Sequence, residues 1–160
     1  MTDTMLHADM REIVVDEIFP HAPATVWKTL ASNDLMGRWL SMTPNGYEPV
    51  VGNHFTYQTS PAGAWDGTIH CQVLEVVPGE RLAYSWKGGD AANVGYGSRL
   101  DTIVTFTLEE VDGGTRLRVV HSGFVLPRNE TAYRNMSGGW SQVVGRIGAV
   151  TEEEASAQPH

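Results

Sequence analysis

Apolar and polar residues alternate along the first segment of the chain that has a regular pattern. Residues 11–19, REIVVDEIF, place Ile13, Val15 and Phe19 on one side of a period-two pattern. Such alternation is typical of a β-strand with one buried face. Pro20 follows at once and cannot donate a hydrogen bond to a sheet. We therefore expect a first strand over residues 11–19.

Two short helices are predicted after this strand. Residues 24–31, ATVWKTLA, and residues 34–40, DLMGRWL, carry their large apolar side chains three or four positions apart. This spacing gathers them on one face of a helix. Pro23 precedes the first stretch, and proline is well accepted at the first position of a helix.

Alternating β-formers fill the middle of the chain, where Gly, Pro, Asn and Asp interrupt them. The predicted strands lie within residues 52–60, 65–77, 81–86, 100–110 and 115–124. Asp112, Gly113 and Gly114 predict a hairpin turn between the last two strands, because glycine accepts the positive φ of tight turns. The glycine-rich residues 88–98 predict a longer, mobile loop that serves as a lid or an opening.

One long helix is predicted towards the C-terminus. Between Asn129 and about Val150, apolar side chains recur at helical spacing: Tyr133, Met136, Trp140, Val143, Val144 and Ile147. Burying five such side chains contributes roughly 7 to 15 kcal/mol before entropy, so the helix is expected to dock on the sheet. Residues 152–160 carry no apolar face and are expected to fray into solvent.

The order of these elements predicts an α+β fold of the helix-grip kind. A strand, two short helices, a run of antiparallel strands and a long final helix form one core when the sheet curves around that helix. A ligand cavity is then expected between the sheet and the helix. We expect a single domain over residues 11–150, with residues 1–10 and 151–160 as flexible termini.

Composition narrows the classes of function. Apolar residues make up 41% of the chain and charged residues 19%, which is typical of a globular domain. The net charge of −8 repels phosphate backbones, so no nucleic-acid partner is expected. No secretory leader is recognised at the start, and no stretch approaches the roughly 18 apolar residues of a membrane span. Since the single cysteine, Cys71, cannot form an internal disulfide, we expect a cytoplasmic protein without membrane insertion.

Three segments carry a resemblance to a known family. They are APATVWKTLASNDLMGRWL at residues 22–40, VTFTLEEVDGGTRLRVVHSGF at residues 104–124, and GGWSQVVGRIGAV at residues 138–150. These segments resemble homologues of the activator of the large heat-shock chaperone ATPase. That family belongs to the START-like, polyketide-cyclase and birch-pollen-allergen superfamily, also called SRPBCC, and the similarity covers approximately residues 11–150.

The resemblance implies a deep hydrophobic cavity under the long helix. Various members of the superfamily bind lipids, sterols, polyketides or other apolar compounds there, so the resemblance implies an apolar ligand without identifying it. The chaperone activators themselves carry a separate N-terminal domain that makes much of the chaperone contact. This chain has no room for such a domain, so we do not expect it to activate a chaperone in the way that those proteins do.

Aromatic residues are the main candidates for the lining of such a cavity, because their faces grip apolar ligands. The predicted ligand-binding residues are Trp39, Phe55, Tyr57, Trp65, Tyr84, Trp86, Phe106, His121, Phe124, Trp140 and Val144. Tyr84 and Trp86 share one strand face with Leu82 and are the better candidates. The competing interpretation is that many of these side chains only fill the core.

His121 is the single weak candidate for a catalytic role. It shares strand parity with Leu117 and Val119, so its ring is expected to face the interior. It is either an acid–base group aimed at a ligand or a core histidine satisfied by hydrogen bonds. His70 and Cys71 point to opposite strand faces, and no CxxC or HExxH motif exists, so neither a metal site nor a cofactor is predicted.

Three classes of function remain open from the sequence. The leading hypothesis is a protein that binds or carries an apolar small molecule. The second is a cyclase or dehydratase, in which His121 with Tyr57 or Tyr84 moves a proton on a polyketide-like substrate. The third is a chaperone accessory or stress-response partner that acts through an exposed apolar patch. A homodimer through a sheet edge or the long helix is compatible with all three.

Overall fold

The structure is a computed structural model that describes residues 9–40 and 42–157. Its elements are β1 (Asp9–Phe19), α2 (Pro23–Ala31), α3 (Asn33–Leu40), β2 (His54–Gln58), β3 (Thr68–Val77), β4 (Arg81–Gly88), β5 (Leu100–Val111), β6 (Gly114–Leu126) and α4 (Glu130–Ala157). Every predicted strand and helix is present. The α+β helix-grip prediction is confirmed.

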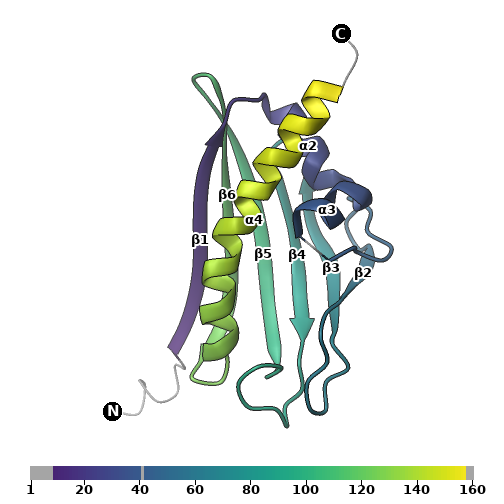
Figure 1. The fold of residues 1–160 in the computed structure, drawn as a ribbon, viewed down its shortest axis with the longest axis vertical. Helices are drawn as coiled ribbons and strands as arrows, with labels where there is room; N and C mark the ends of the chain where they lie inside the picture. The colour runs from purple at the N-terminus through teal and green to yellow at the C-terminus, as the bar shows by residue number, and fades with distance from the viewer. Residues whose placement is uncertain (1–8, 41, 158–160) are drawn as a thin grey trace.

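The strands form one antiparallel sheet in the order β1-β6-β5-β4-β3-β2. Helix α4 crosses one face of this sheet, and α2 and α3 lie beside its C-terminal half (Figure 1). The N-terminal half of α4 lies near the end of the sheet where the longer loops gather (Figure 1). No helix in the described part of the chain is long and apolar enough to cross a membrane.

The hairpin between β5 and β6 forms at the predicted turn. Gly113 has a φ of 81°, which residues with a side chain rarely adopt. At Gly114, a Cβ atom would lie 1.9 Å from the carbonyl oxygen of Phe19 at the end of β1. The glycine therefore lets β6 start directly against the end of β1, where Phe19 pairs with Thr115.

The buried face of the sheet follows the predicted strand parity. Val104 pairs with His121, Phe106 with Val119, and Leu108 with Leu117, and all six side chains are buried. Because alternate residues share a face, this register points the whole set at α4. The predicted inward orientation of the His121 ring is confirmed, with no part of it exposed.

Both ends of the fold extend further than the sequence predicted. Met10 pairs with Val125 in the sheet, and α4 continues through residues 151–157. Thr151 is fully buried, and its hydroxyl lies 2.8 Å from that of Thr29 in α2. Residues 1–8 and 158–160, also predicted to be flexible, lie outside the described residues.

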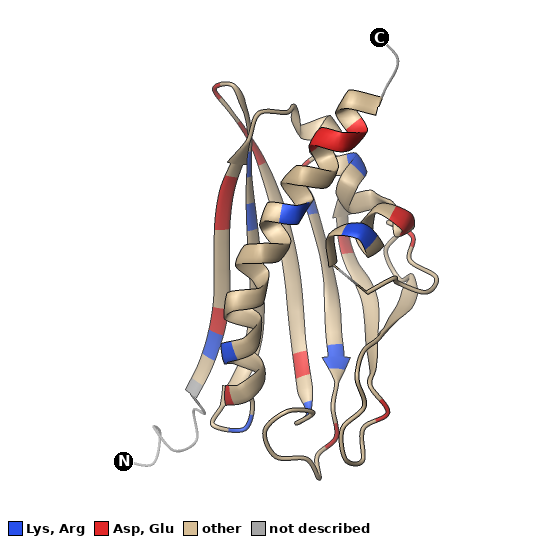
Figure 2. Cartoon of the chain, in the orientation of Figure 1, with Lys and Arg blue, Asp and Glu red and all other residues tan. Residues whose placement is uncertain are grey.

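Polar contacts explain why the last turns of α4 are helical without an apolar face. Arg38 of α3 pairs with Glu153 and Glu154 in the acidic stretch near the end of α4 (Figure 2). Together with the pair of threonines, these contacts hold the C-terminal turns against α2 and α3. Contacts between polar side chains of distant elements do not contribute to hydrophobic periodicity, so that periodicity alone does not predict them.

Candidate functional site

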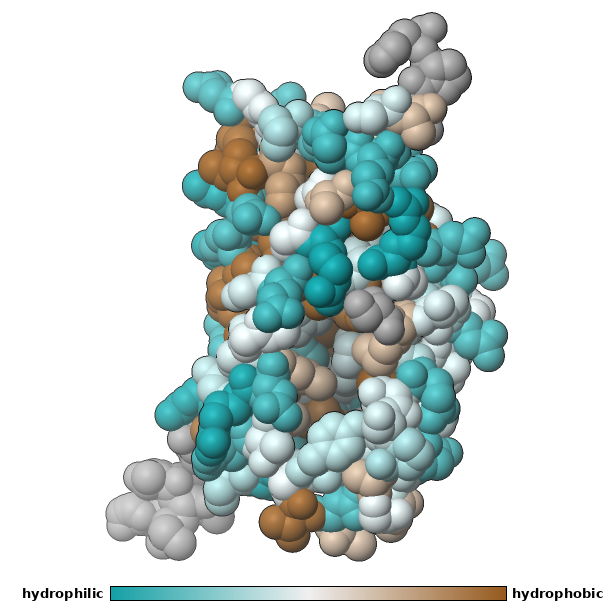
Figure 3. Space-filling view, in the orientation of Figure 1, coloured by the Kyte–Doolittle hydropathy of each residue, from teal (hydrophilic) through white to brown (hydrophobic). Residues whose placement is uncertain are grey.

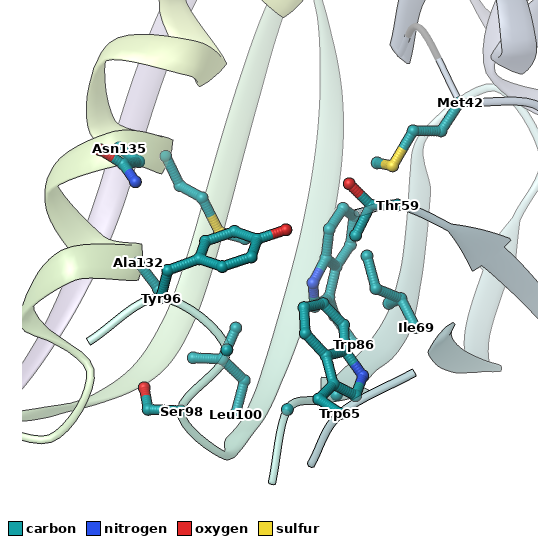
Figure 4. A pocket seen from close by; sticks show the side chains of 14 residues that line it. Met42, Thr59, Trp65, Ile69, Trp86, Tyr96, Ser98, Leu100, Ala132 and Asn135 are labelled. Carbon is teal, nitrogen blue, oxygen red and sulfur yellow. The ribbon is translucent and has the colours of Figure 1, made fainter. Parts of the chain in front are cut away.

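An apolar pocket of about 140 Å³ lies between the sheet and the first turns of α4 (Figure 4). Trp86 of β4 forms part of its wall on the sheet side, and Met136 of α4 forms part of its wall on the helix side. The complete lining is Met42, Thr59, Trp65, Ile69, Trp86, Gly88, Gly89, Tyr96, Gly97, Ser98, Leu100, Ala132, Asn135 and Met136. No residue of this lining carries a formal charge.

The glycine-rich loop before β5 closes one side of the pocket. Asn93 in this loop donates hydrogen bonds to the carbonyl oxygens of Ala62, at 2.6 Å, and Gly97, at 3.1 Å. The Tyr96 hydroxyl donates to the carbonyl oxygen of Ser60 at 2.8 Å. The loop is therefore fastened to the segment between β2 and β3, and it serves as a wall of the pocket.

Asn129 ties the same loop to the start of α4. Its side-chain nitrogen lies 2.8 Å from the carbonyl oxygen of Arg99 and 3.2 Å from the Ser98 hydroxyl. Its side-chain oxygen accepts a hydrogen bond from the Val125 backbone at 2.9 Å. One fully buried amide thus holds the loop, the end of β6 and the helix start in fixed positions.

Two of the predicted ligand-binding residues, Trp65 and Trp86, line the pocket. Trp140 lines a neighbouring cleft. The others are core residues that line neither cavity: Trp39, Phe55, Tyr57, Tyr84, Phe106, His121, Phe124 and Val144. Their side chains pack on one another in this structure, and their contact with a ligand stays a prediction.

The close packing is seen in the ring contacts of the core. The Tyr84 ring centre lies 5.1 Å from that of Phe55 and 5.9 Å from that of Phe106, and Phe106 is 6.0 Å from Trp140. Aromatic rings at these separations attract each other in edge-to-face and tilted arrangements. They fill the middle of the space under α4, so the pocket is confined to the loop end.

Both nitrogen atoms of His121 have partners. The indole N–H of Trp140 donates to Nδ1 at 2.9 Å, so this nitrogen is the unprotonated one. Nε2 then carries the proton and donates to the Thr102 hydroxyl at 2.7 Å, and Thr102 donates to the carbonyl oxygen of Trp86 at 2.8 Å. Burial lowers the pKa of His121 to about 3. This geometry favours the structural interpretation of His121 over the catalytic one.

Tyr57 and Tyr84 do not form an acid–base pair with His121. Their hydroxyl oxygens lie 3.3 Å from each other, and that of Tyr57 donates to the Met36 sulfur at 2.8 Å. Burial raises the pKa of both hydroxyls well above the ordinary value. The contact required by the cyclase hypothesis, between histidine and tyrosine, is therefore replaced by contacts to other groups.

Cys71 is a buried thiol whose pKa burial raises above its ordinary value. A protonated thiol is a weak nucleophile. Across residues 9–40 and 42–157, no group of three or more His, Cys, Asp or Glu side chains is arranged to hold a metal ion.

Sequence reasoning missed most of the pocket lining. The sequence predicts a mobile lid or an opening at the glycine-rich loop, whereas the structure fastens this loop by hydrogen bonds and places Tyr96 in the pocket wall. Ala132 and Met136 lie four residues apart on α4, and only Met136 belonged to the apolar pattern. A small residue such as Ala132 leaves space, and a search for large aromatic side chains overlooks it.

A more open cleft of about 210 Å³ adjoins the pocket along α4. The two cavities share Met42, Trp86, Asn135 and Met136. The face shown in Figure 3 is hollowed beside α4, with apolar side chains between polar ones. Two flexible methionines thus stand between the pocket and the cleft.

Comparisons with known proteins identify relatives of this arrangement. A family model described as "Activator of Hsp90 ATPase homolog 1-like protein" matches residues 20–152. The crystal structure of protein MLL2253 from Mesorhizobium loti is 31% identical, with a TM-score of 0.75, over 89% of this chain and 98% of that one. No curated protein sequence matches significantly.

Two more distant structures share the fold. DynU16, a protein in the dynemicin biosynthetic locus, is 22% identical with a TM-score of 0.67, over 88% of this chain and 47% of that one. The Aha1 dimer from Colwellia psychrerythraea is 17% identical with a TM-score of 0.68, over 89% of this chain and 97% of that one.

Proposed function

Because the chain belongs to the "Activator of Hsp90 ATPase homolog 1-like protein" family, we propose that it binds an uncharged, apolar small molecule in the pocket under α4. The observation that carries this proposal is the pocket itself. Aromatic and aliphatic side chains form most of its walls, the polar lining residues Thr59, Ser98 and Asn135 are uncharged, and no charged residue lines it. Such a site takes up apolar molecules by the hydrophobic effect and leaves ions in water.

The volume indicates the size of the ligand. A dry cavity of about 150 Å³ lined by apolar side chains is large enough for benzene. The pocket, at about 140 Å³, is close to this size and matches one aromatic ring or a short alkyl segment. Drug-sized ligands generally occupy roughly 300 to 1,000 Å³, so a sterol or lipid needs more space than the pocket alone supplies.

A larger ligand can extend into the adjoining cleft. Met42 and Met136 line both cavities, and unbranched thioether side chains change rotamer readily. In this proposal, a polyketide-like or lipid-like molecule places one end in the pocket and the remainder along α4. The dynemicin locus of DynU16 is consistent with such a ligand, although at 22% identity that similarity shows the fold alone.

The proposal is tested by native mass spectrometry of protein purified gently from its own host. We expect an extra mass in the native spectrum that is lost on denaturation. Ala132→Leu places additional atoms in the pocket and should abolish this mass, because Ala132 is a wall residue. Ala149→Leu lies on the exposed side of the same helix and should leave it unchanged.

Two results together would contradict the proposal. They are the absence of any extra mass in the wild type and the absence of thermal stabilisation by a panel of apolar metabolites. A ligand that binds only the native state raises the Tm as the ligand concentration increases, so a site that binds any member of the panel must show thermal stabilisation.

A homodimer remains a further prediction for this chain. The edge strand β1 exposes Met10, Val14 and Ile18, which are the side chains that a second copy would cover. Glu12 and Asp16 alternate with them, and charges on an edge strand oppose pairing between sheets. The Aha1 neighbour from Colwellia psychrerythraea is itself a dimer.

A further inference from the structure

The indole nitrogen of Trp86 is a buried donor without a hydrogen-bond partner among the described residues. The side chain is 4% exposed, so solvent does not reach it freely. Three other tryptophans each have an acceptor. Trp39 donates to the Thr29 carbonyl at 3.0 Å, Trp65 to the Thr68 carbonyl at 2.9 Å, and Trp140 to His121. Among the described residues, Trp86 is thus the buried tryptophan whose N–H has no acceptor.

The unpaired N–H belongs to a ring that is held firmly in the wall of the pocket. The Trp86 ring centre lies 5.3 Å from Tyr57, 5.3 Å from His121 and 6.5 Å from Trp140. Figure 4 shows the Trp86 nitrogen on the edge of the ring that faces Tyr96 across the pocket. The donor therefore has a fixed direction before any ligand arrives, but the nitrogen atom itself is buried, so an acceptor reaches it only when a neighbouring side chain of the pocket shifts.

A buried donor without an acceptor is costly, and native proteins rarely leave one. Since no described residue accepts from Trp86, a ligand that enters the pocket and displaces a neighbouring side chain can supply the acceptor. A ligand that displaces water without replacing its hydrogen bond loses affinity. The pocket should thus discriminate between molecules of equal shape that differ in one acceptor atom.

We infer that Trp86 selects ligands that carry a neutral hydrogen-bond acceptor, such as a ketone, ester or ether oxygen, next to an aromatic ring or short alkyl group. The absence of charged residues from the lining disfavours a carboxylate, because a buried anion would lack a counter-charge there. This inference rests on the proposed function and specifies the ligand class of the same pocket.

The inference is tested with two probes of nearly equal shape, acetophenone and α-methylstyrene, which differ in a C=O against a C=CH₂ group. Their dissociation constants are measured for the wild type and for Trp86→Phe, which removes the N–H. We expect the preference for acetophenone over α-methylstyrene to fall by about fivefold in Trp86→Phe, the value of one neutral hydrogen bond. The Trp86 indole proton of the wild type should also move downfield with acetophenone alone.

Trp65→Phe is the matched control. Trp65 lines the same pocket, but its N–H already donates to Thr68. This variant should weaken both probes equally and leave their ratio unchanged. Saturable binding of both probes, with the same ratio in Trp86→Phe as in the wild type and no indole shift, would overturn the inference and leave the proposed function intact. Failure of both probes to bind the wild type would contradict the proposed function and, with it, this inference.

Discussion

The hydrogen bonds of His121 run in one direction, from Trp140 through the imidazole ring and Thr102 to the Trp86 carbonyl. This series of hydrogen bonds requires the neutral imidazole ring, since Nδ1 must remain unprotonated to accept the hydrogen bond from Trp140. Adding a proton to Nδ1 would break the contact to Trp140 and leave a charge in a fully buried position. The histidine therefore stabilises the fold only while it stays neutral.

A pH dependence of stability follows from this arrangement. The folded pKa of His121 is about 3, against an ordinary value of 6.5, so the unfolded chain binds more protons between these values. The contribution of His121 is complete above pH 6.5 and declines as the pH falls towards 3. We expect the loss of this contribution to lower the unfolding free energy by about 2 kcal/mol as the pH falls from 8 to 5.

The prediction for His121 is checked by NMR titration of its ring Cε1 proton and by urea unfolding of wild type and His121→Gln. The ring proton should show no titration down to pH 5. The free-energy difference between wild type and variant should shrink as the pH falls through this range. A titration midpoint near 6.5 in the native state would show that the ring is not held neutral as described.

At the scale of elements, helix α4 contains glycines whose surroundings differ. A Cβ atom at Gly138 would meet no atom within 4 Å, whereas one at Gly148 would lie 2.6 Å from the ring of Phe19. Gly148 therefore lets the helix approach β1 closely. At Gly138 the small residue gives no packing advantage, and glycine carries its usual entropic cost in a helix.

Alanine at these two positions should have opposite effects. Gly138→Ala should raise the unfolding free energy by about 0.5 to 1 kcal/mol and the Tm by a few degrees. Gly148→Ala should lower the unfolding free energy by roughly 1 to 3 kcal/mol, because the Phe19 ring must move. Thermal unfolding followed by circular dichroism measures both, and equal shifts in the same direction would refute the assigned contacts.

The existence and type of the elements could be predicted because each depends on local periodicity. The strand around His121 and the turn at Gly113 follow directly from alternation and glycine chemistry. The true end of α4 could not be predicted in this way, since the contact between Thr29 and Thr151 joins residues far apart in the chain. Polar contacts between distant elements leave no periodic signal.

At the scale of the whole molecule, the pocket results from where α4 stops filling the concave face of the sheet. Strand parity shows that Tyr84 and Trp86 share the inner face, but not how closely the helix approaches each of them. The structure buries Tyr84 among other rings and leaves Trp86 at the cavity. This difference arises from the tertiary packing of α4, so sequence alone could not separate core residues from lining residues.

The central claim is that the space between Trp86 and the first turns of α4 holds an apolar ligand. Isotope-filtered NOE measurements on the complex with acetophenone test it most directly. We predict contacts from the ring protons of the probe to the methyl groups of Ile69, Ala132 and Met136, which line the pocket. Contacts confined to exposed side chains such as Val14 and Ile18, or binding without any contact to these three methyl-bearing residues, would contradict the account.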